Sequence, residues 1–560
     1  MKILIIGGVA GGATTATRLR RMNEEAEIIV IDRGDYVSFA NCGLPYYIGD
    51  VIRKKEKLLL QTPKSFLERF NIDVRIKQEA IHIDRAKKEV KIRKINTGEE
   101  YVENYDKLVL SPGANPINPY RNMKINNIMT LRTVNDSVRI KEEIIGENIK
   151  NIAIIGGGYI GVEIAENLAN YKDKNITIIE KKSHLIASID KDIACFVNKK
   201  LKENEINILL NNGVEEIEEN KGKFNIKLER GNIEVDYIII AIGVSPESKL
   251  AKEAGLEINE KGAIIVNKYL QTKDENIYAL GDAIENTNSI TGKKTYIALA
   301  GPANRQARIV ADNICGKKEE YEGAIGSSIL KVFDSNLGTV GLNEEICKTQ
   351  KISYKKMIVS PYSHATYYPG ANMVNIKAIY NEKGEILGAQ IFGKEGVDKL
   401  TDILSIAIKL KINVRELEKL ELCYAPPFSS AKSPINILAN AIVNELDGLV
   451  KNIYIEDLEN ETEKYILDVR TKEEFEDGHI SSAINIPLDE LRQNLYKLDK
   501  SKEIIVHCRT GLRSYIACRI LTQNGFNVKN LVGGYYLYSF MKGEEKYDEW
   551  KRKIGYWWNL

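Results

Sequence analysis

Short, uninterrupted apolar runs recur along the chain, and a glycine-rich turn follows two of them. Residues 3–6 (Ile-Leu-Ile-Ile) lead into a turn over 7–12, and residues 152–155 (Ile-Ala-Ile-Ile) lead into a turn over 156–161. A run of this kind is typical of a strand buried on both faces, and a glycine turn after it is typical of a strand-turn-helix unit. The pattern therefore predicts two parallel-sheet units of one design.

Each unit also carries an acid beyond its glycine turn. Asp32 lies twenty residues after Gly12, and Glu180 lies nineteen residues after Gly161. In such units the glycines let the backbone approach a pyrophosphate at a helix N-terminus, and the acid accepts hydrogen bonds from a ribose. The second turn is a full GxGxxG, whereas Val9 replaces the middle glycine of the first. Purely structural turns are the alternative, but two copies with their acids favour two nucleotide sites and hence two redox cofactors.

The same pattern divides the rest of the chain. Residues 101–113 and 236–246 each read as a strand ending in a tight turn, and 276–282 reads as a buried strand that delivers Gly281 and Asp282 to a helix N-terminus. There the carboxylate can reach cofactor hydroxyls. Nucleotide signatures stop at about residue 323, and a polar stretch over 447–464 predicts a linker before a fresh strand-helix alternation.

Composition narrows the classes of function. A chain of 560 residues with 43% hydrophobic residues predicts three or four domains, each with its own core. Its 80 basic and 78 acidic side chains argue against nucleic acid or an anionic membrane as the main partner. No apolar run approaches the roughly 18 residues of a membrane span. Seven cysteines without CxxC pairs do not form a disulfide framework, so we expect a reducing cytoplasm and no metal site.

Two cysteines lie in sequence contexts that favour a chemical role over core packing. Cys42 follows Ser38 and Asn41 at a predicted loop-to-helix start, where a helix N-terminus would lower the thiol pKa. A second cysteine does not lie four or five residues away, so the partner sulfur must come from the substrate. Packing as a small apolar side chain is the alternative.

Cys508 opens the loop Cys-Arg-Thr-Gly-Leu-Arg-Ser directly after a strand over 504–507. Backbone N–H groups of this loop, with Arg513, would hold an anionic sulfur species. Phosphatase loops are similar but have one more residue between their cysteine and arginine. Core packing is the interpretation for the remaining cysteines, which are Cys195, Cys315, Cys347, Cys423 and Cys518.

These motifs carry a family resemblance. The paired fingerprints and Gly281-Asp282 resemble the two-dinucleotide flavoprotein disulfide reductases, and the Cys42 segment resembles the coenzyme A disulfide reductases among them. The tail, with 468–470 (Asp-Val-Arg), 478–480 (Gly-His-Ile) and the Cys508 loop, resembles rhodanese sulfurtransferase domains. Together they resemble coenzyme A disulfide reductase–rhodanese fusions, which are similar to NADH-dependent persulfide reductases.

The resemblance implies an α/β fold class with two Rossmann-like dinucleotide-binding domains, an α+β dimerisation domain and a C-terminal α/β rhodanese domain. It also implies a homodimer that binds FAD, NADH and coenzyme A, without nucleic acid or membrane. The expected boundaries are 1–148 and 271–322 for the FAD-binding domain, 149–270 for the NAD-binding domain, 323–446 for the dimerisation domain, 447–464 for the linker and 465–560 for the rhodanese domain.

The resemblance assigns roles to individual residues. Cys42, Cys508, Tyr367 and Tyr424 are the implied catalytic residues; Tyr368 is an adjacent rival to Tyr367, and loop packing is the alternative for both tyrosines. Glu180 favours NADH by repelling a 2′-phosphate, although Lys181 and Lys182 soften that repulsion and leave NADPH as an alternative.

The implied binding residues form four sets. For FAD they are Gly7, Gly8, Ala10, Gly11, Gly12, Asp32, Arg33, Ser111, Gly113, Arg132, Gly281 and Asp282; for NAD they are Gly156, Gly158, Tyr159, Gly161 and Glu180. For coenzyme A they are Thr14, Arg18, Arg21, Ser38, Asn41, Asn304 and Lys432, and in the rhodanese loop they are Arg509, Gly511 and Arg513. A solvated basic helix face is the alternative for the two coenzyme A arginines.

The resulting hypothesis is an NADH- and FAD-dependent reductase of coenzyme A persulfide, polysulfide or coenzyme A disulfide, with sulfur delivered by the C-terminal domain. One rival is an NADH oxidase or peroxidase in which Cys42 cycles through a sulfenic acid. Relatives of that kind carry a histidine in the first glycine turn, and the turn over 7–12 has none. Another rival is a sulfur carrier or redox sensor in which FAD is only structural.

Overall fold

The computed structural model describes residues 1–120, 127–146, 148–458 and 465–543. The chain divides into two compact units. The first comprises Met1–Leu185 and Leu201–Gly326, and the second comprises Ile186–Lys200 and Ser327–Leu560. A short internal segment thus belongs to the unit formed by the C-terminal part of the chain.

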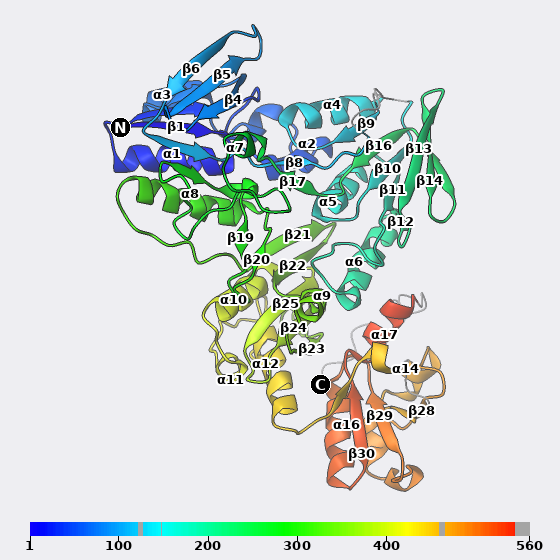
Figure 1. Ribbon diagram of the computed structural model, residues 1–560. Helices are drawn as coiled ribbons and strands as arrows, with labels where there is room; N and C mark the ends of the chain where they lie inside the picture. The colour runs from blue at the N-terminus through cyan, green and yellow to red at the C-terminus, as the bar shows by residue number, and fades with distance from the viewer. Residues whose placement is uncertain (121–126, 147, 459–464, 544–560) are drawn as a thin grey trace. The chain divides into compact units, whose positions relative to one another are not determined.

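The first unit contains the two parallel sheets that the apolar runs predict (Figure 1). One sheet has the order β18-β7-β1-β2-β3, and helices α1 and α8 lie side by side next to it. Ile3, Leu4 and Ile5 of its central strand are fully buried, as expected for a strand covered on both faces. The elements are β1 (Lys2–Ile6), α1 (Ala10–Met22), β2 (Glu27–Ile31), β3 (Asp73–Arg75), β7 (Lys107–Leu110), β18 (Ile277–Ala279) and α8 (Ala300–Ile314).

The second parallel sheet has the order β12-β11-β10-β16-β9. Its central strand β10 runs into helix α5 through the second glycine turn, as β1 runs into α1. An antiparallel sheet, β13-β14-β15, shares a core with it. The elements are β9 (Ile128–Thr130), β10 (Asn151–Ile155), α5 (Tyr159–Leu168), β11 (Asn175–Ile179), β12 (Asn207–Leu209), β13 (Val214–Asn220), β14 (Lys223–Leu228), β15 (Asn232–Val235) and β16 (Tyr237–Ile240).

The boundaries of the inserted region differ from the expected 149–270. Strand β9 precedes residue 149 but pairs with β16 in the second sheet. At the other end, Ala251, Leu256 and Ile264 belong to the core of the first sheet, and α7 (Lys249–Glu253) packs against β4 (Gln78–Asp84). The prediction followed the glycine motifs, and neither β9 nor α7 carries one.

The second unit holds an antiparallel sheet and a parallel sheet. The antiparallel sheet has the order β21-β22-β25-β24-β23, with α10 packed on β22 and β25. Helix α12 begins at a capping box in which Ser433 and Asn436 exchange hydrogen bonds. The elements are α6 (Lys191–Glu203), whose residues up to Lys200 belong to this unit, β21 (Ser328–Val332), β22 (Ser335–Gly341), α9 (Glu344–Gln350), β23 (Lys355–Val359), β24 (Asn375–Tyr380), β25 (Ile386–Gly393), α10 (Val397–Lys409), α11 (Val414–Leu417) and α12 (Pro434–Leu446).

The C-terminal sheet is parallel, with the order β26-β30-β29-β27-β28. Part of the predicted linker is therefore structured, because β26 pairs with β30 and because Ile455 and Leu458 are buried. The polar composition of the stretch hid these few apolar residues, and 459–464 lie outside the described residues. The elements are β26 (Asn452–Ile453), α13 (Ile455–Leu458), β27 (Ile466–Asp468), α14 (Lys472–Glu476), β28 (Ile484–Asn485), α15 (Leu488–Leu491), β29 (Glu503–His507), α16 (Leu512–Gln523), β30 (Asn527–Leu531) and α17 (Gly534–Lys542).

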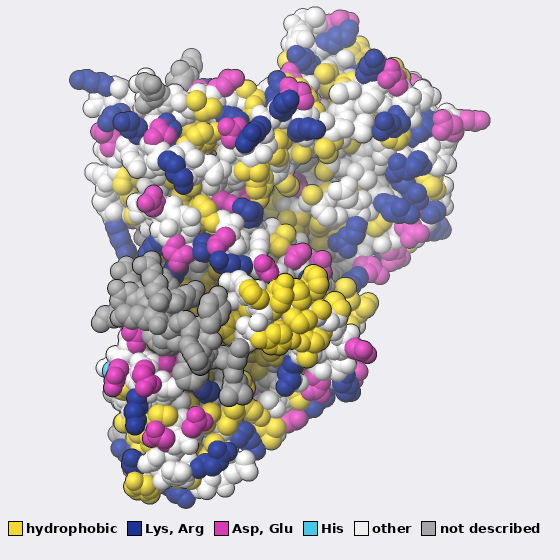
Figure 2. Space-filling model, turned by 180° about the vertical axis from the view of Figure 1, so that it is seen from behind, with side chains coloured by type: hydrophobic (Ala, Val, Ile, Leu, Met, Phe, Trp, Pro, Cys, Tyr) yellow, Lys and Arg dark blue, Asp and Glu magenta, His cyan; other side chains and the backbone are white. Residues whose placement is uncertain are grey.

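The surface charge matches the near-neutral composition. Figure 2 shows Lys and Arg side chains interspersed with Asp and Glu on the face it presents. Among the helices of the described residues, none combines the length and apolar character needed to cross a bilayer.

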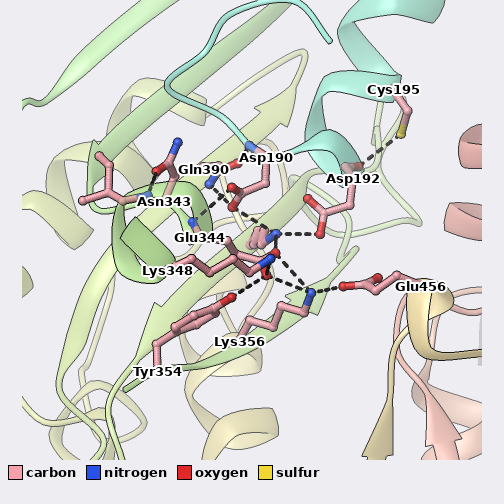
Figure 3. Close-up of polar contacts among 12 residues, drawn as sticks. Asp190, Asp192, Cys195, Asn343, Glu344, Lys348, Tyr354, Lys356, Gln390 and Glu456 are labelled. Atoms are coloured by element: carbon pink, nitrogen blue, oxygen red, sulfur yellow. Dashed lines mark hydrogen bonds and ion pairs between the residues drawn. The ribbon is translucent and has the colours of Figure 1, made fainter. Parts of the chain in front are cut away.

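A buried ion cluster joins three separate segments of the second unit (Figure 3). The Nζ of the fully buried Lys377 on β24 lies 3.0 Å from Asp190, 2.6 Å from Asp192 and 2.5 Å from Glu344. Lys356 on β23 lies 3.1 Å from Glu344 as well. Burial alone would raise the pKa of Glu344, but Lys377 and Lys356 lower it to about 2. The segment before α6 is thus tied to the antiparallel sheet by charge.

Replacing Lys377 by methionine should destabilise the second unit, because the buried Asp190 and Asp192 and the partly buried Glu344 lose their shared cation. We expect a loss of about 3–5 kcal/mol in the free energy of unfolding, measured from urea-induced changes in circular dichroism. The exposed Lys383 on a neighbouring turn gives the matched control, Lys383→Met, which should change little. Equal stability of the two variants would contradict this account of the cluster.

Candidate active sites

At the carboxyl ends of β1 and β10, the backbone of each glycine turn approaches the backbone of a neighbouring strand end very closely. Gly7 has φ +96°, and a Cβ there would lie 2.1 Å from the Ser111 carbonyl oxygen. Gly156 has φ +106°, and a Cβ there would lie 2.5 Å from the Ala241 carbonyl oxygen. Because a backbone carbonyl cannot give way, only glycine fits either position.

The helices that follow start without side-chain caps. Within the described part of the chain, neither Val9 at the start of α1 nor Gly158 at the start of α5 makes a side-chain capping hydrogen bond. The N-cap residues therefore do not occupy the first-turn N–H groups, as an anion site at a helix N-terminus requires. An added Cβ on Gly158 meets none of the described atoms within 4 Å, which explains why valine is tolerated at the equivalent position 9.

The two acids are fixed against these turns. Asp32 accepts hydrogen bonds from the backbone N–H groups of Gly8 and Gly34, each at 2.7 Å. Glu180 accepts from those of Gly157 and Lys182, each at 2.8 Å. Burial raises the pKa of Asp32, although the backbone hydrogen bonds oppose it. Each acid thus lies beside a helix N-terminus, where a ribose adjoining a pyrophosphate would be bound.

The other predicted FAD residues gather around the first turn. A Cβ on Gly11 would lie 2.5 Å from Ser111 Oγ, and one on Gly113 would lie 2.7 Å from an Arg132 guanidinium nitrogen. Arg132 Nη2 lies 4.0 Å from Asp282 Oδ2. Burial raises the pKa of Asp282, and Arg132 opposes this. Two of the remaining residues belong to the first turn: Gly12 packs on the Gly7 carbonyl, and Ala10 begins α1. The other two make hydrogen bonds: the Gly281 N–H donates to the Gln306 side chain, and the exposed Arg33 donates to the Asn115 side chain.

Cys42 lies on a single 3-10 turn, Asn41–Gly43, that leads directly into α2 (Leu44–Ile48). Its side chain is exposed. In the amide orientation that satisfies both partners, Asn41 donates to the Arg132 carbonyl and accepts from Arg132 Nη1, each at 3.0 Å. The cysteine turn is therefore fastened to the same arginine that faces Asp282.

The expected lowering of the Cys42 pKa is wrong for this structure. Loss of hydration around the sulfur raises the thiol pKa, the carboxylates of Glu163 and Asp282 raise it further, and Arg132 lowers it. Loss of hydration is the largest of these effects, and together with the carboxylates it outweighs the partial charges of the helix start. The sequence could not show that Glu163 and Asp282 converge on Cys42.

Glu163 is a residue that the sequence reasoning missed. It lies on α5, two positions beyond Gly161, and it accepts a hydrogen bond of 3.5 Å from the Tyr46 hydroxyl. Burial, and then the neighbouring Glu166, raise its pKa to about 7. A carboxyl that titrates near neutral pH is thus placed within electrostatic reach of Cys42. Its position directly after a dinucleotide fingerprint was the available signal.

The predicted coenzyme A residues fall into separate groups. Thr14 on α1 donates to Asn304 on α8 at 2.8 Å, and the exposed Arg21 lies on α1 as well. Ser38, with φ +46°, donates its N–H to the Gly8 carbonyl just before the Cys42 turn. Lys432 is exposed and belongs to the second unit.

Arg18 differs from its prediction as a phosphate ligand. Its Nε donates to Asp312 Oδ1 at 2.8 Å, and Lys317 lies 3.1 Å from the other oxygen of that carboxylate. Asp312 is almost fully buried and holds the arginine against α8. Much of the Arg18 charge is therefore balanced within the protein.

The two predicted tyrosines meet in the second unit. The hydroxyls of Tyr367 and Tyr424 lie 2.7 Å apart, and their hydrogen bond raises the pKa of Tyr367. Both rings are exposed, at 66% and 47%. Tyr368 instead contacts the His364 ring edge-on. Cys423, predicted to pack in the core, is exposed beside this pair, because the loop that carries it lies on the surface.

The Cys508 loop lies at the carboxyl end of β29. Cys508 is only 1% exposed, and its sulfur accepts a hydrogen bond from the Gly511 N–H at 3.1 Å. Gly511 has φ +126°, a conformation that a side chain would strain, and Arg509 directly follows the cysteine. The loop thus presents backbone N–H to sulfur, as predicted.

Arg513, predicted to hold the anionic sulfur, is engaged elsewhere. Its guanidinium forms two hydrogen bonds to Glu474 on α14, of 2.6 and 2.8 Å. Glu474 is itself buried, so the pair fixes α14 against the loop and balances the arginine's charge. Glu474 was not recognised because it is 39 residues away in sequence.

Three family descriptions match successive stretches of the chain. Pyridine nucleotide-disulphide oxidoreductase matches residues 1–307, the dimerisation domain of that family matches 327–434, and the rhodanese-like domain matches 452–539. The predicted fold class, with two dinucleotide-binding domains, a dimerisation domain and a rhodanese domain, is thereby confirmed.

Individual proteins are similar over most of the chain. A coenzyme A disulfide reductase of Staphylococcus aureus is 34% identical over 440 residues, which cover 78% of this chain and 98% of that protein. The chain in the crystal structure of reduced Bacillus anthracis CoADR-RHD is 45% identical in sequence and superposes with a TM-score of 0.93. The match covers 97% of this chain and 98% of that chain. The NAD-dependent persulfide reductase of A. fulgidus is 37% identical, with a TM-score of 0.91 and coverage of 96% and 100%.

Replacing Glu163 by glutamine should make Cys42 more reactive, because one of the two carboxylates that raise its pKa becomes neutral. We expect alkylation of Cys42 by iodoacetamide at pH 7.5, followed by peptide mass spectrometry, to accelerate roughly two- to fivefold. Glu68→Gln, at an exposed glutamate on α3 (Pro63–Phe70), is the control and should leave the rate unchanged. A slower reaction of the Glu163→Gln protein would refute the proposed influence of Glu163.

Proposed function

Because this chain belongs to the pyridine nucleotide-disulphide oxidoreductase family, we propose that it uses NADH and FAD to reduce coenzyme A persulfide, polysulfide or coenzyme A disulfide. The observation that carries this proposal is an exposed thiol, Cys42, in the same unit as both glycine turns. A second thiol, Cys508, lies in the rhodanese domain and supplies sulfur.

The chain's residues fit both nucleotides. Uncapped helix starts and fixed acids at the first and second turns would hold FAD and NADH, respectively. Arg132 and Asp282 would border the flavin near Cys42. When bound, FAD accepts the electrons of NADH and returns them to the sulfur of Cys42.

Cys42 performs the sulfur chemistry in this proposal. Its thiolate attacks one sulfur of a disulfide or the sulfane sulfur of a persulfide; the S–S bond of the substrate breaks, and in both cases a coenzyme A thiolate leaves. Two electrons then cleave the new S–S bond on Cys42, which releases a second coenzyme A thiolate from the mixed disulfide or hydrosulfide from the persulfide and restores the Cys42 thiolate. Glu163, with a pKa of about 7, can exchange a proton with this centre at neutral pH.

The dimerisation domain supports a homodimer, and the tyrosine pair is proposed to act across it. Tyr367 and Tyr424 share one hydrogen bond and remain exposed, so their hydroxyls can donate to a leaving thiolate at the partner subunit's cysteine. Thr14, Arg21 and Asn304 are proposed to bind coenzyme A from α1 and α8, together with Ser38 and Asn41 of the same unit.

The rhodanese domain delivers sulfur. The Cys508 thiolate takes a sulfane sulfur from a donor, whose S–S or S–sulfonate bond breaks, and becomes a persulfide that the loop N–H groups stabilise. A coenzyme A thiolate then removes the terminal sulfur and restores Cys508.

We also propose a cytoplasmic location, since thiols that act in catalysis need a reducing compartment.

Anaerobic oxidation of NADH should proceed with coenzyme A persulfide or coenzyme A disulfide as acceptor, and not with peroxide. Cys42→Ser should abolish both reductions, because it removes the nucleophile. Cys508→Ser should leave reduction of preformed coenzyme A persulfide intact while abolishing sulfur transfer from thiosulfate. Cys315→Ser, at a half-buried thiol, is the control. Turnover with peroxide alone would instead identify an oxidase or peroxidase.

Glu180→Gln should weaken the preference for NADH. The glutamine oxygen can keep the hydrogen bond from Gly157, but the negative charge that repels a 2′-phosphate is lost. We expect the ratio of kcat/KM for NADPH to that for NADH to rise roughly tenfold in steady-state assays. Glu229→Gln, a neighbouring substitution that does not alter the strand-end acid, should leave the ratio unchanged. An unchanged ratio in both variants would exclude Glu180 as the discriminating residue.

A further inference from the structure

Helix α17 begins directly behind the Cys508 loop. The backbone N–H of Tyr535 donates to the carbonyl of Cys508 at 2.8 Å, and that of Tyr536 donates to the carbonyl of Arg509 at 2.9 Å. These donors belong to the first turn of α17, where N–H groups lack partners within the helix. The first turn of one helix thus binds the backbone of the loop that carries the thiol.

These two hydrogen bonds set the orientation of two peptide planes. In a trans peptide the carbonyl and the following N–H point in opposite directions. Holding the carbonyls of Cys508 and Arg509 on α17 therefore directs the N–H groups of Arg509 and Thr510 away from α17. With the Gly511 N–H, which donates to the Cys508 sulfur at 3.1 Å, they form successive donors of one loop.

The contact is too close for any side chain. Gly534 has φ +58°, and a Cβ there would lie 2.5 Å from the Cys508 carbonyl oxygen and 2.7 Å from that of Arg509. Both neighbours are backbone atoms of the loop itself, so a side chain would displace the loop. The three atoms nearest to a Cβ on Gly533 instead belong to Leu537 of α17 itself, at 2.5 to 3.2 Å.

The helix is anchored independently of the loop. The guanidinium carbon of Arg470 lies 4.2 Å from the centre of the Tyr535 ring, and Asp468 holds that guanidinium through Nε and Nη2. Further along, the rings of Tyr536 and Phe540 lie 5.6 and 4.7 Å from Phe196 on α6. A helix fixed in this way can impose its geometry on the loop.

We propose that the first turn of α17 is the positioning element of the sulfurtransferase loop, with Gly534 as its positioning residue. Its contact with the two loop carbonyls aligns the N–H groups that stabilise the Cys508 thiolate and the persulfide formed on it. This rests on the proposed role of Cys508 as the sulfur-carrying thiol.

The test is Gly534→Ala in the full chain, compared with wild type. We expect sulfur transfer from thiosulfate to fall roughly tenfold or more. The pH profile of Cys508 alkylation, followed by peptide mass spectrometry, should move to higher pH. Reduction of preformed coenzyme A persulfide should remain at the wild-type rate.

A matched control separates loop contact from backbone strain. Gly543→Ala places a side chain at φ +68° at the other end of α17, where a Cβ meets no described atom within 4 Å. This variant should retain transfer and the pH profile. If Gly534→Ala behaves as Gly543→Ala does, or loses transfer without a change in the alkylation profile, the proposal is overturned.

A second pair covers the case in which Gly534→Ala fails to fold, as judged by circular dichroism. Tyr536→Pro removes the N–H that binds the Arg509 carbonyl, at a first-turn position that tolerates proline, whereas Tyr536→Ala removes only the ring. Transfer and alkylation should change further in the proline variant than in the alanine variant, and equal effects would overturn the proposal. Absence of transfer in the wild-type chain would instead contradict the proposed function.

Discussion

Close approach of one backbone to another, at the carboxyl ends of parallel strands, is the constraint on which the candidate sites depend. Gly7 and Gly156 lie against carbonyls of neighbouring strand ends, and Gly534 lies against the carbonyls of the Cys508 loop. In each case the missing side chain lets backbone N–H groups, rather than side chains, face the position of an anion. Phosphate and thiolate are thus approached by the same physical means in different sheets of one chain.

Several charged side chains near the candidate sites, by contrast, are paired within the protein. Asp312 binds Arg18, Glu474 binds Arg513, and a cluster of carboxylates surrounds Lys377. Such pairs hold segments that are far apart in sequence, and they leave little unbalanced charge for a ligand. This pairing is consistent with a net charge of only +2. Arg132 differs from these paired residues because its guanidinium contacts the Asn41 amide of the Cys42 turn and also lies 4.0 Å from Asp282.

The sequence predicted what depends on neighbouring residues and missed what depends on distant ones. Local sequence patterns predicted the glycine turns, the acids Asp32 and Glu180, and the Cys508 loop. In each of these, residues close together in sequence determine the backbone conformation. The partner of Arg513, the carboxylates around Cys42 and the place of β9 in the second sheet are set by folding. The apparent defect at Val9 was resolved only by geometry, since the equivalent Gly158 has room for a side chain.

The two thiols lie in surroundings that suit different substrates. A sulfane sulfur is one atom, so a thiol that is 1% exposed and lined by backbone N–H groups can receive it from a small donor. A disulfide that carries two coenzyme A groups needs an open approach, and Cys42 is exposed on a surface turn. Loss of hydration, and then nearby carboxylates, raise the pKa of Cys42, so its thiolate must gain stability from what binds beside it. Cys508 instead has a stabilising donor already built into its own loop, and the first turn of α17 holds that loop in place.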